Sequence, residues 1–162
     1  MLRRPRLRTR YPRGLTVFPS AALALVMSIL LLVAGAPVRA ESDKEVEAHK
    51  VVLDLAGAFS NDGFKMRDGH WAGTLKSKEP ALIAVNLYAG NQYWFSVGAL
   101  QPAKKIDVSV YDETGRQVTT ESYNEGERAA AGFSPTSSGQ YYISVALLEG
   151  ADSSFCLVYS YK

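Results

Sequence analysis

YWFSV at residues 93–97 and IDVSV at residues 106–110 both alternate along the chain between two kinds of side chain. Alternation with a period of two indicates β-strands that have one face in a core. An inward-pointing Asp107 would bury a charge at a cost of several kcal/mol, so the isoleucine and valines of the second stretch must face inward. The same reasoning predicts a core lined by Tyr93, Phe95, Val97, Ile106, Val108, Val110, Tyr141, Ile143, Val145, Leu147, Phe155, Leu157 and Tyr159.

Similar runs recur through the C-terminal part of the chain. Short segments rich in Gly, Asn, Asp, Pro and Ser separate them, and these residues favour turns. We expect strands near residues 81–88, 92–100, 105–111, 116–122, 128–133, 140–148 and 153–161. Short strands at this spacing, without helices between them, are typical of an antiparallel sandwich or barrel.

A helix is expected ahead of these strands. Ser42 and Glu45 have the spacing of a capping box, in which each side chain accepts a hydrogen bond from the other residue's backbone N–H. An apolar stripe follows at spacings of four, three and four residues: Ala48, Val52, Leu55 and Phe59. This spacing indicates an amphipathic helix over about 44–58, which Ser60-Asn61-Asp62-Gly63 would end.

A short hairpin is expected after the helix. Phe64 and Met66 alternate with basic residues, and Asp68-Gly69 is a pair that favours a two-residue hairpin turn. The second strand of this hairpin would run over residues 70–75.

The basic charge of the chain is concentrated at its start. The 162 residues carry a formal charge of +2, but residues 1–40 hold seven arginines and no acid, so residues 41–162 carry −5. A positive segment, an apolar run over residues 21–36 and Val38-Arg39-Ala40 are typical of an export signal cleaved after Ala40. An uncleaved anchor is the alternative, but about 16 apolar residues span only some 24 Å of helix.

These features divide the chain into an export signal (1–40), a helix and turn (41–63) and a β-domain (64–162). The product would be periplasmic or extracellular and, after cleavage, not bound to a membrane. An acidic domain is a poor partner for nucleic acid, which needs clustered Lys and Arg.

Three stretches resemble the bacterial pre-peptidase C-terminal (PPC) domain: LYAGNQYWFSV (87–97), IDVSVYDETG (106–115) and SGQYYISV (138–145). The resemblance covers about residues 71–162 and implies a jelly-roll-like β-sandwich. Such domains are usually accessory modules of secreted peptidases and other exported proteins, without catalysis of their own, and some bind calcium or polymers. The expected fold is therefore all-β: a jelly-roll-like antiparallel β-sandwich preceded by one amphipathic helix and a short hairpin.

The sequence offers few catalytic residues, so we do not expect an enzyme. Ser134 lacks the glycines of a nucleophile elbow, and no metal-ligand, phosphate-loop or dinucleotide motif is present. The alternative is an enzyme that uses His70 with Asp68. Cys156 lies in an apolar run, which predicts a small buried side chain, although a reactive thiol is the other interpretation.

We expect no cofactor, and calcium is the alternative. Asp62, Asp68 and Asp152 lie in turn segments and supply the oxygen ligands that Ca²⁺ binds. Asp and Asn are also favoured in turns for backbone reasons, so we favour solvated turn residues.

Aromatic side chains are the most suggestive binding residues. With the Ile and Val face inside, Trp94, Tyr111 and Tyr142 project outward, and Asp112 and Glu113 follow the first tyrosine. These five residues could bind a protein or a polysaccharide. The helix stripe could instead cover the rings, which we favour because the stripe needs a partner.

The expected function is therefore an exported, non-catalytic binding or structural module. The alternatives are a carbohydrate-binding module that uses the three rings, and an accessory or inhibitory partner of a secreted peptidase.

Overall fold

The computed structural model describes residues 42–162, so the expected export signal and its cleavage after Ala40 lie outside the described residues. One helix, α2 (Asp43–Ser60), precedes nine strands. The strands are β1 (Lys65–Met66), β2 (Trp71–Leu75), β3 (Ala81–Leu87), β4 (Tyr93–Ala99), β5 (Ala103–Tyr111), β6 (Glu121–Glu125), β7 (Arg128–Phe133), β8 (Gly139–Gly150) and β9 (Ser153–Tyr161). No helix in this part of the chain combines the length and the hydropathy needed to cross a bilayer.

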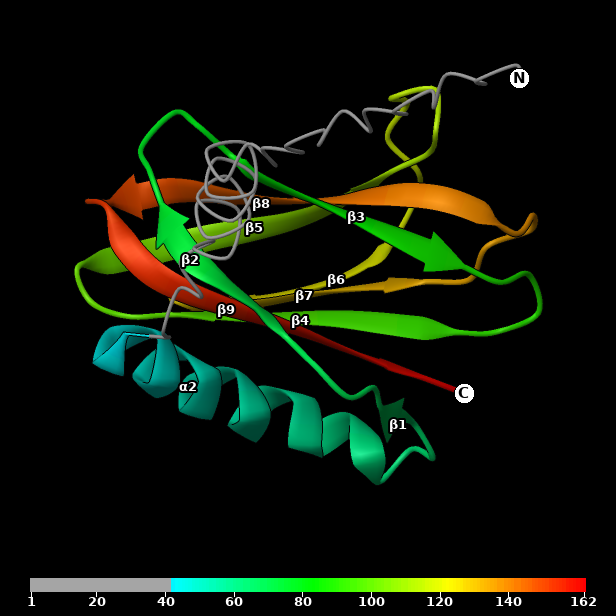
Figure 1. The fold of residues 1–162 in the computed structure, drawn as a ribbon, viewed down its shortest axis with the longest axis horizontal. Helices are drawn as coiled ribbons and strands as arrows, with labels where there is room; N and C mark the ends of the chain where they lie inside the picture. Colours follow the sequence, from blue (N-terminus) through cyan, green and yellow to red (C-terminus); the bar gives the residue numbers. More distant parts are fainter. Residues whose placement is uncertain (1–41) are drawn as a thin grey trace, which may run out of the picture. The chain divides into compact units, whose positions relative to one another are not determined.

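The strands form two antiparallel sheets that pack face to face (Figure 1). The larger sheet has the order β1-β9-β4-β7-β6, and β2 also pairs with β9. The smaller sheet has the order β3-β8-β5. The order β2-β9-β4-β7 opposite β3-β8-β5 is that of a jelly roll, because the chain passes repeatedly from one sheet to the other. The structure confirms the all-β sandwich preceded by one helix.

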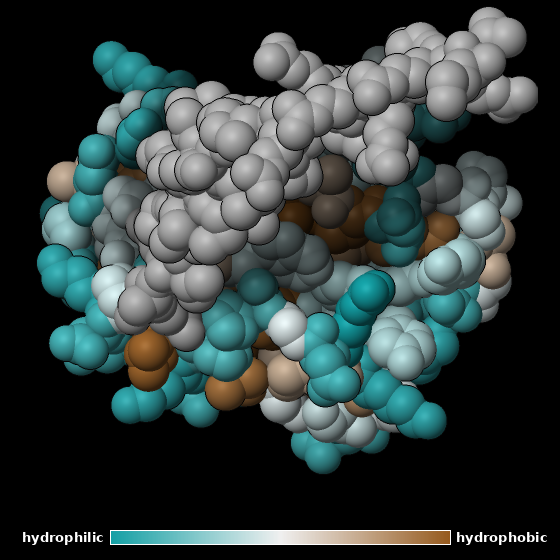
Figure 2. Space-filling view, viewed as in Figure 1, coloured by the Kyte–Doolittle hydropathy of each residue, from teal (hydrophilic) through white to brown (hydrophobic). Residues whose placement is uncertain are grey.

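The core lies between the two sheets, and its lining agrees with the sequence alternation. Every residue that we expected to face inward belongs to one buried cluster, and the side chains of Phe95, Ile106, Val110, Ile143 and Leu157 have no exposed surface. Figure 2 shows apolar side chains gathered between the two layers. The face assignment from Asp107 is confirmed.

Helix α2 covers the outer face of β4 and β9. Its capping box is present: the Glu45 backbone N–H donates to the Ser42 hydroxyl at 3.3 Å, and the Ser42 N–H donates to the Glu45 carboxylate at 2.8 Å. A second buried cluster joins helix and sheet through Ala48, Val52, Ala56, Cys156 and Val158. Cys156 is thus a buried apolar side chain, as its surroundings in the sequence predicted.

The helix approaches the sheet closely at Gly98 on β4. A Cβ atom at this position would lie 2.8 Å from the backbone nitrogen of Val52, so only glycine fits without displacing the helix. The close approach brings the small residues of α2 into contact with the strands.

The expected hairpin of residues 64–75 is wrong. Both β1 and β2 pair antiparallel with β9, so they run in the same direction along one edge of it. The turn at Asp68-Gly69, with φ at 93° for the glycine, interrupts this edge and does not reverse the chain. A turn signal marks a break in a strand, but it does not select the strand's partner.

The strand expected at 116–122 is displaced. The structure places β6 at Glu121–Glu125, where it pairs with β7 across a turn at Gly126 and Glu127. All five β6 residues are exposed, so the strand has no apolar alternation by which it could have been located.

Candidate functional site

The three outward aromatic residues do not form one platform. Trp94 lies on β4 in the larger sheet, whereas Tyr111 and Tyr142 lie on β5 and β8 in the smaller one. The outer faces of the two sheets of a sandwich point in opposite directions. The expected joint surface is therefore wrong, because alternation distinguishes inside from outside but does not assign a strand to a sheet.

Trp94 is enclosed by the helix and by its own sheet. Its ring stacks on Phe59 of α2, with centroids 4.4 Å apart and planes inclined by 12°. On the neighbouring strand, a Cβ at Gly132 would lie 2.9 Å from the Trp94 ring, so the ring packs directly on this glycine. The helix covers this ring, as expected, and Trp94 anchors the end of the helix to the sheet. The same expectation is wrong for Tyr111 and Tyr142, because the helix packs on the other sheet.

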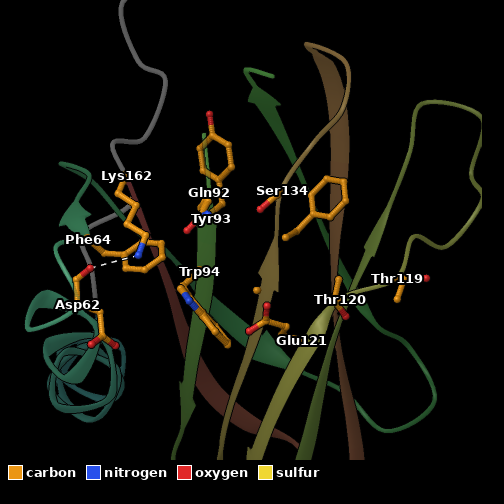
Figure 3. Close-up of a pocket in the computed structure, with 12 residues that line it drawn as sticks. Asp62, Phe64, Gln92, Tyr93, Trp94, Thr119, Thr120, Glu121, Ser134 and Lys162 are labelled. Atoms are coloured by element: carbon orange, nitrogen blue, oxygen red, sulfur yellow. Dashed lines mark hydrogen bonds between the residues drawn. The ribbon is translucent and has the colours of Figure 1, made fainter. Parts of the chain in front are cut away.

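A groove of about 690 Å³ lies beside Trp94 on the outer face of the larger sheet (Figure 3). Glu121 and Thr120 line it beyond the tryptophan, while Asp62, Phe64 and Lys162 line its helix side. The Lys162 ammonium donates to the Asp62 backbone carbonyl at 3.3 Å and lies 4.3 Å from the centre of the Phe64 ring. The face of the Trp94 ring that stacks on Phe59 is covered by the helix, so it is closed to a sugar.

The outer face of the smaller sheet brings the two tyrosines together. Tyr111 and Tyr142 are direct partners in the β5–β8 ladder, and Ala84 of β3 is paired with Tyr142 on its other side. The Tyr142 hydroxyl donates to the Gln140 side-chain oxygen at 2.8 Å. We call this surface the tyrosine face, and it consists of Leu82, Ala84, Asn86, Asp107, Ser109, Tyr111, Gln140, Tyr142, Ser144 and Ala146.

The tyrosine face has the character of a protein-binding surface. Both tyrosines are partly exposed, Ala84 and Gln140 are exposed, and Asp107 is the single charged residue of the set. Two large rings beside small side chains provide contact area at a low cost in conformational entropy. Helix α2 packs on β4 and β9 of the other sheet and not on this surface.

Asp112 belongs to a tight turn at the end of the tyrosine face. Its carboxylate accepts hydrogen bonds from the Thr114 hydroxyl and N–H, and it forms a two-bonded ion pair with Arg116 at 3.0 and 3.2 Å. The Thr114 hydroxyl, followed by the Arg116 backbone N–H, lowers the pKa of Asp112 from 3.8 to about 2. Asp112 therefore stabilises its own turn, while Glu113 beside it is exposed.

Stability should depend on pH through Asp112. Because its pKa is lower in the folded chain, the carboxylate stabilises the fold above the ordinary value of 3.8, and this contribution disappears as the pH falls to about 2. We expect Asp112→Asn to lower the thermal midpoint near neutral pH and to converge with the wild type in acid. Midpoints measured across this range, with Glu113→Gln as the matched variant, test this. Parallel curves for wild type and Asp112→Asn would contradict the assignment.

The three aspartates proposed for calcium do not come together. Asp62 follows α2, Asp68 lies between β1 and β2, and Asp152 lies in the β8–β9 turn, where it accepts the Ser77 N–H at 3.0 Å. Within residues 42–162, no three His, Cys, Asp or Glu side chains form a group that could hold a metal ion.

The side chains of His49 and His70 are in contact, which the sequence did not indicate. His49 of α2 stacks on His70, which precedes β2, with ring centroids 4.1 Å apart. They lie in different elements, so only the docking of the helix brings them together. This contact gives His70 a packing role between helix and sheet.

No family model matches this chain, and no curated protein is significantly similar to it. The resemblance of residues 71–162 to PPC domains therefore remains a prediction from the sequence.

Proposed function

We propose that the protein is an exported, non-catalytic binding module that holds a protein ligand on the tyrosine face. The observation that carries this proposal is the direct pairing of Tyr111 with Tyr142 on a sheet face that helix α2 does not cover. Tyrosine is enriched at protein interfaces because its rigid ring buries a large area and its hydroxyl tolerates a wet rim.

The surroundings of the pair support a protein ligand over a polysaccharide. Platforms for sugar polymers need several exposed rings in one plane, and Trp94, the third candidate, lies on the other sheet. Ala84 lies opposite Tyr142 and Leu82 lies diagonal to it, so both add apolar area, while Gln140, Ser109 and Asp107 provide a polar rim. This division into an apolar centre and a polar rim is typical of protein interfaces.

Export is the second part of the proposal. The arginine-rich start, the apolar run and the residues before Ala40 support it. An accessory or inhibitory role toward a secreted peptidase would agree with the PPC resemblance and would use the same face.

Photo-crosslinking in the producing cells tests the proposal. Benzoylphenylalanine at position 142 should yield a cross-linked protein that disappears when Tyr111→Ala is added, because loss of an interface tyrosine weakens binding by about 30-fold. Position 123 is the matched control, since Tyr123 is also partly exposed but lies on β6 of the other sheet.

Two outcomes would contradict the protein ligand. Identical cross-links at positions 142 and 123 would show that the face has no specificity. Retention of the wild type on insoluble polysaccharide, lost in the Tyr111→Ala/Tyr142→Ala variant, would assign the same face to carbohydrate instead.

A further inference from the structure

Strand β3 is an edge strand without the usual protection. In the described part of the chain it is hydrogen-bonded to β8 alone, so every second residue directs its N–H and C=O away from the sheet. Edge strands normally carry charged residues or proline that prevent pairing with another chain. Residues 81–87 contain neither, and no charged residue occurs from Pro80 to Gln92.

The other end of this sheet and the far edge of the larger sheet are protected in the usual way. β5 carries Lys104, Lys105 and Asp107, and β6 carries Glu121 and Glu125. β3 thus differs from these two edges, while β2, which also lacks a charged residue, is shorter and is followed directly by Lys76. In Figure 1 it lies along the near edge of its sheet, and from the same side Figure 2 shows apolar side chains between the layers.

Exposed apolar side chains gather at the same edge. Among the described large hydrophobic residues, the two with the greatest exposure are Leu82, at 66%, on β3 and Tyr88, at 63%, directly after it. Both belong to the outward set of alternating residues, because Leu82, Ala84 and Asn86 are exposed while Ile83 and Val85 are buried.

We propose that two copies of this chain pair through β3, antiparallel and centred on Ala84. This register places Leu82 opposite Asn86 of the second copy and Pro80 opposite Tyr88. Tyr88 then lies diagonal to Leu82, within reach of an aromatic side chain across paired strands. The two most exposed apolar residues thus cover each other on both sides of the twofold axis.

Charge does not oppose a second copy in this orientation. Antiparallel pairing brings Lys78 and Glu79 of one chain beside residues 88–91 of the other, which are uncharged. No like charges meet along the pair. The result is one continuous six-stranded sheet built from the two smaller sheets.

Position 84 gives a sharp test because Ala84 of one copy lies opposite Ala84 of the other across the twofold axis. Ala84→Lys and Ala84→Glu should each weaken the dimer by about tenfold or more through like-charge repulsion. An equimolar mixture of the two variants should restore it as a heterodimer. Sedimentation of the protein expressed from the full sequence, over a wide concentration range, measures both effects. Leu148→Lys is the matched control, because Leu148 is 54% exposed on β8 and lies outside the proposed contact.

A cross-link provides an independent readout. Directly opposed residues of antiparallel strands have Cα atoms about 4.5–5.5 Å apart, within the range of about 4.4–6.8 Å for a disulfide. Ala84→Cys should therefore form a disulfide-linked dimer on mild oxidation, and Leu148→Cys should not. A wild type that stays monomeric at all concentrations, or a dimer that Ala84→Lys leaves intact, would overturn the proposal.

Discussion

Phe95→Ala should lower the free energy of unfolding by about 3–5 kcal/mol. Phe95 lies on the inner face of β4 with no exposed surface, and its ring centroid is 5.6 Å from that of Tyr159. Removal of the ring loses its transfer free energy and leaves a cavity that the two sheets cannot close. Urea unfolding followed by the fluorescence of Trp71 and Trp94 measures the loss.

The matched control for Phe95 is an exposed hydrophobic residue. Leu148 is 54% exposed, so Leu148→Ala should change stability by no more than about 0.5 kcal/mol. A loss below about 1 kcal/mol for Phe95→Ala would show that this ring does not lie in a closed core.

Val52→Asp should detach helix α2 from the sheet and destabilise the protein by about 3–5 kcal/mol. Val52 has no exposed surface and packs with Cys156 and Val158 against the outer face of the larger sheet. An aspartate there would be a buried charge within an apolar cluster. Equilibrium unfolding in urea gives the size of the effect.

Leu53→Asp is the control, because Leu53 follows in the same helix and is 37% exposed. It introduces the same charge at a larger cost in helix propensity and should leave the docking intact. The thiol of Cys156 reports docking directly: it is buried beneath α2, so a thiol reagent should modify it faster in Val52→Asp than in Leu53→Asp. Equal rates in the two variants would contradict the docking that we describe.

Strand faces and the helix could be predicted because local sequence determines them. Alternation together with Asp107 assigned the inward face of β5, and the capping box and the stripe from Ala48 to Phe59 located α2. In both cases the free energy of burial acts on neighbouring residues of one element, so the signal is present in a short stretch.

Strand partners could not be predicted, because they depend on distant residues. The turn signal Asp68-Gly69 predicted that β1 and β2 pair with each other as a hairpin. Both strands pair instead with β9, about ninety residues later in the sequence. For the same reason, the sequence predicted that both tyrosines face outward but not which sheet they share. Each ring was correctly placed outward, yet only the topology separates Trp94 from Tyr111 and Tyr142.

Strand β9 is an inner strand of the larger sheet although it is the last strand described. It joins β1, β2 and β4, and helix α2 rests on it. The N-terminal elements therefore cannot reach their native positions until residues 153–161 have left the ribosome.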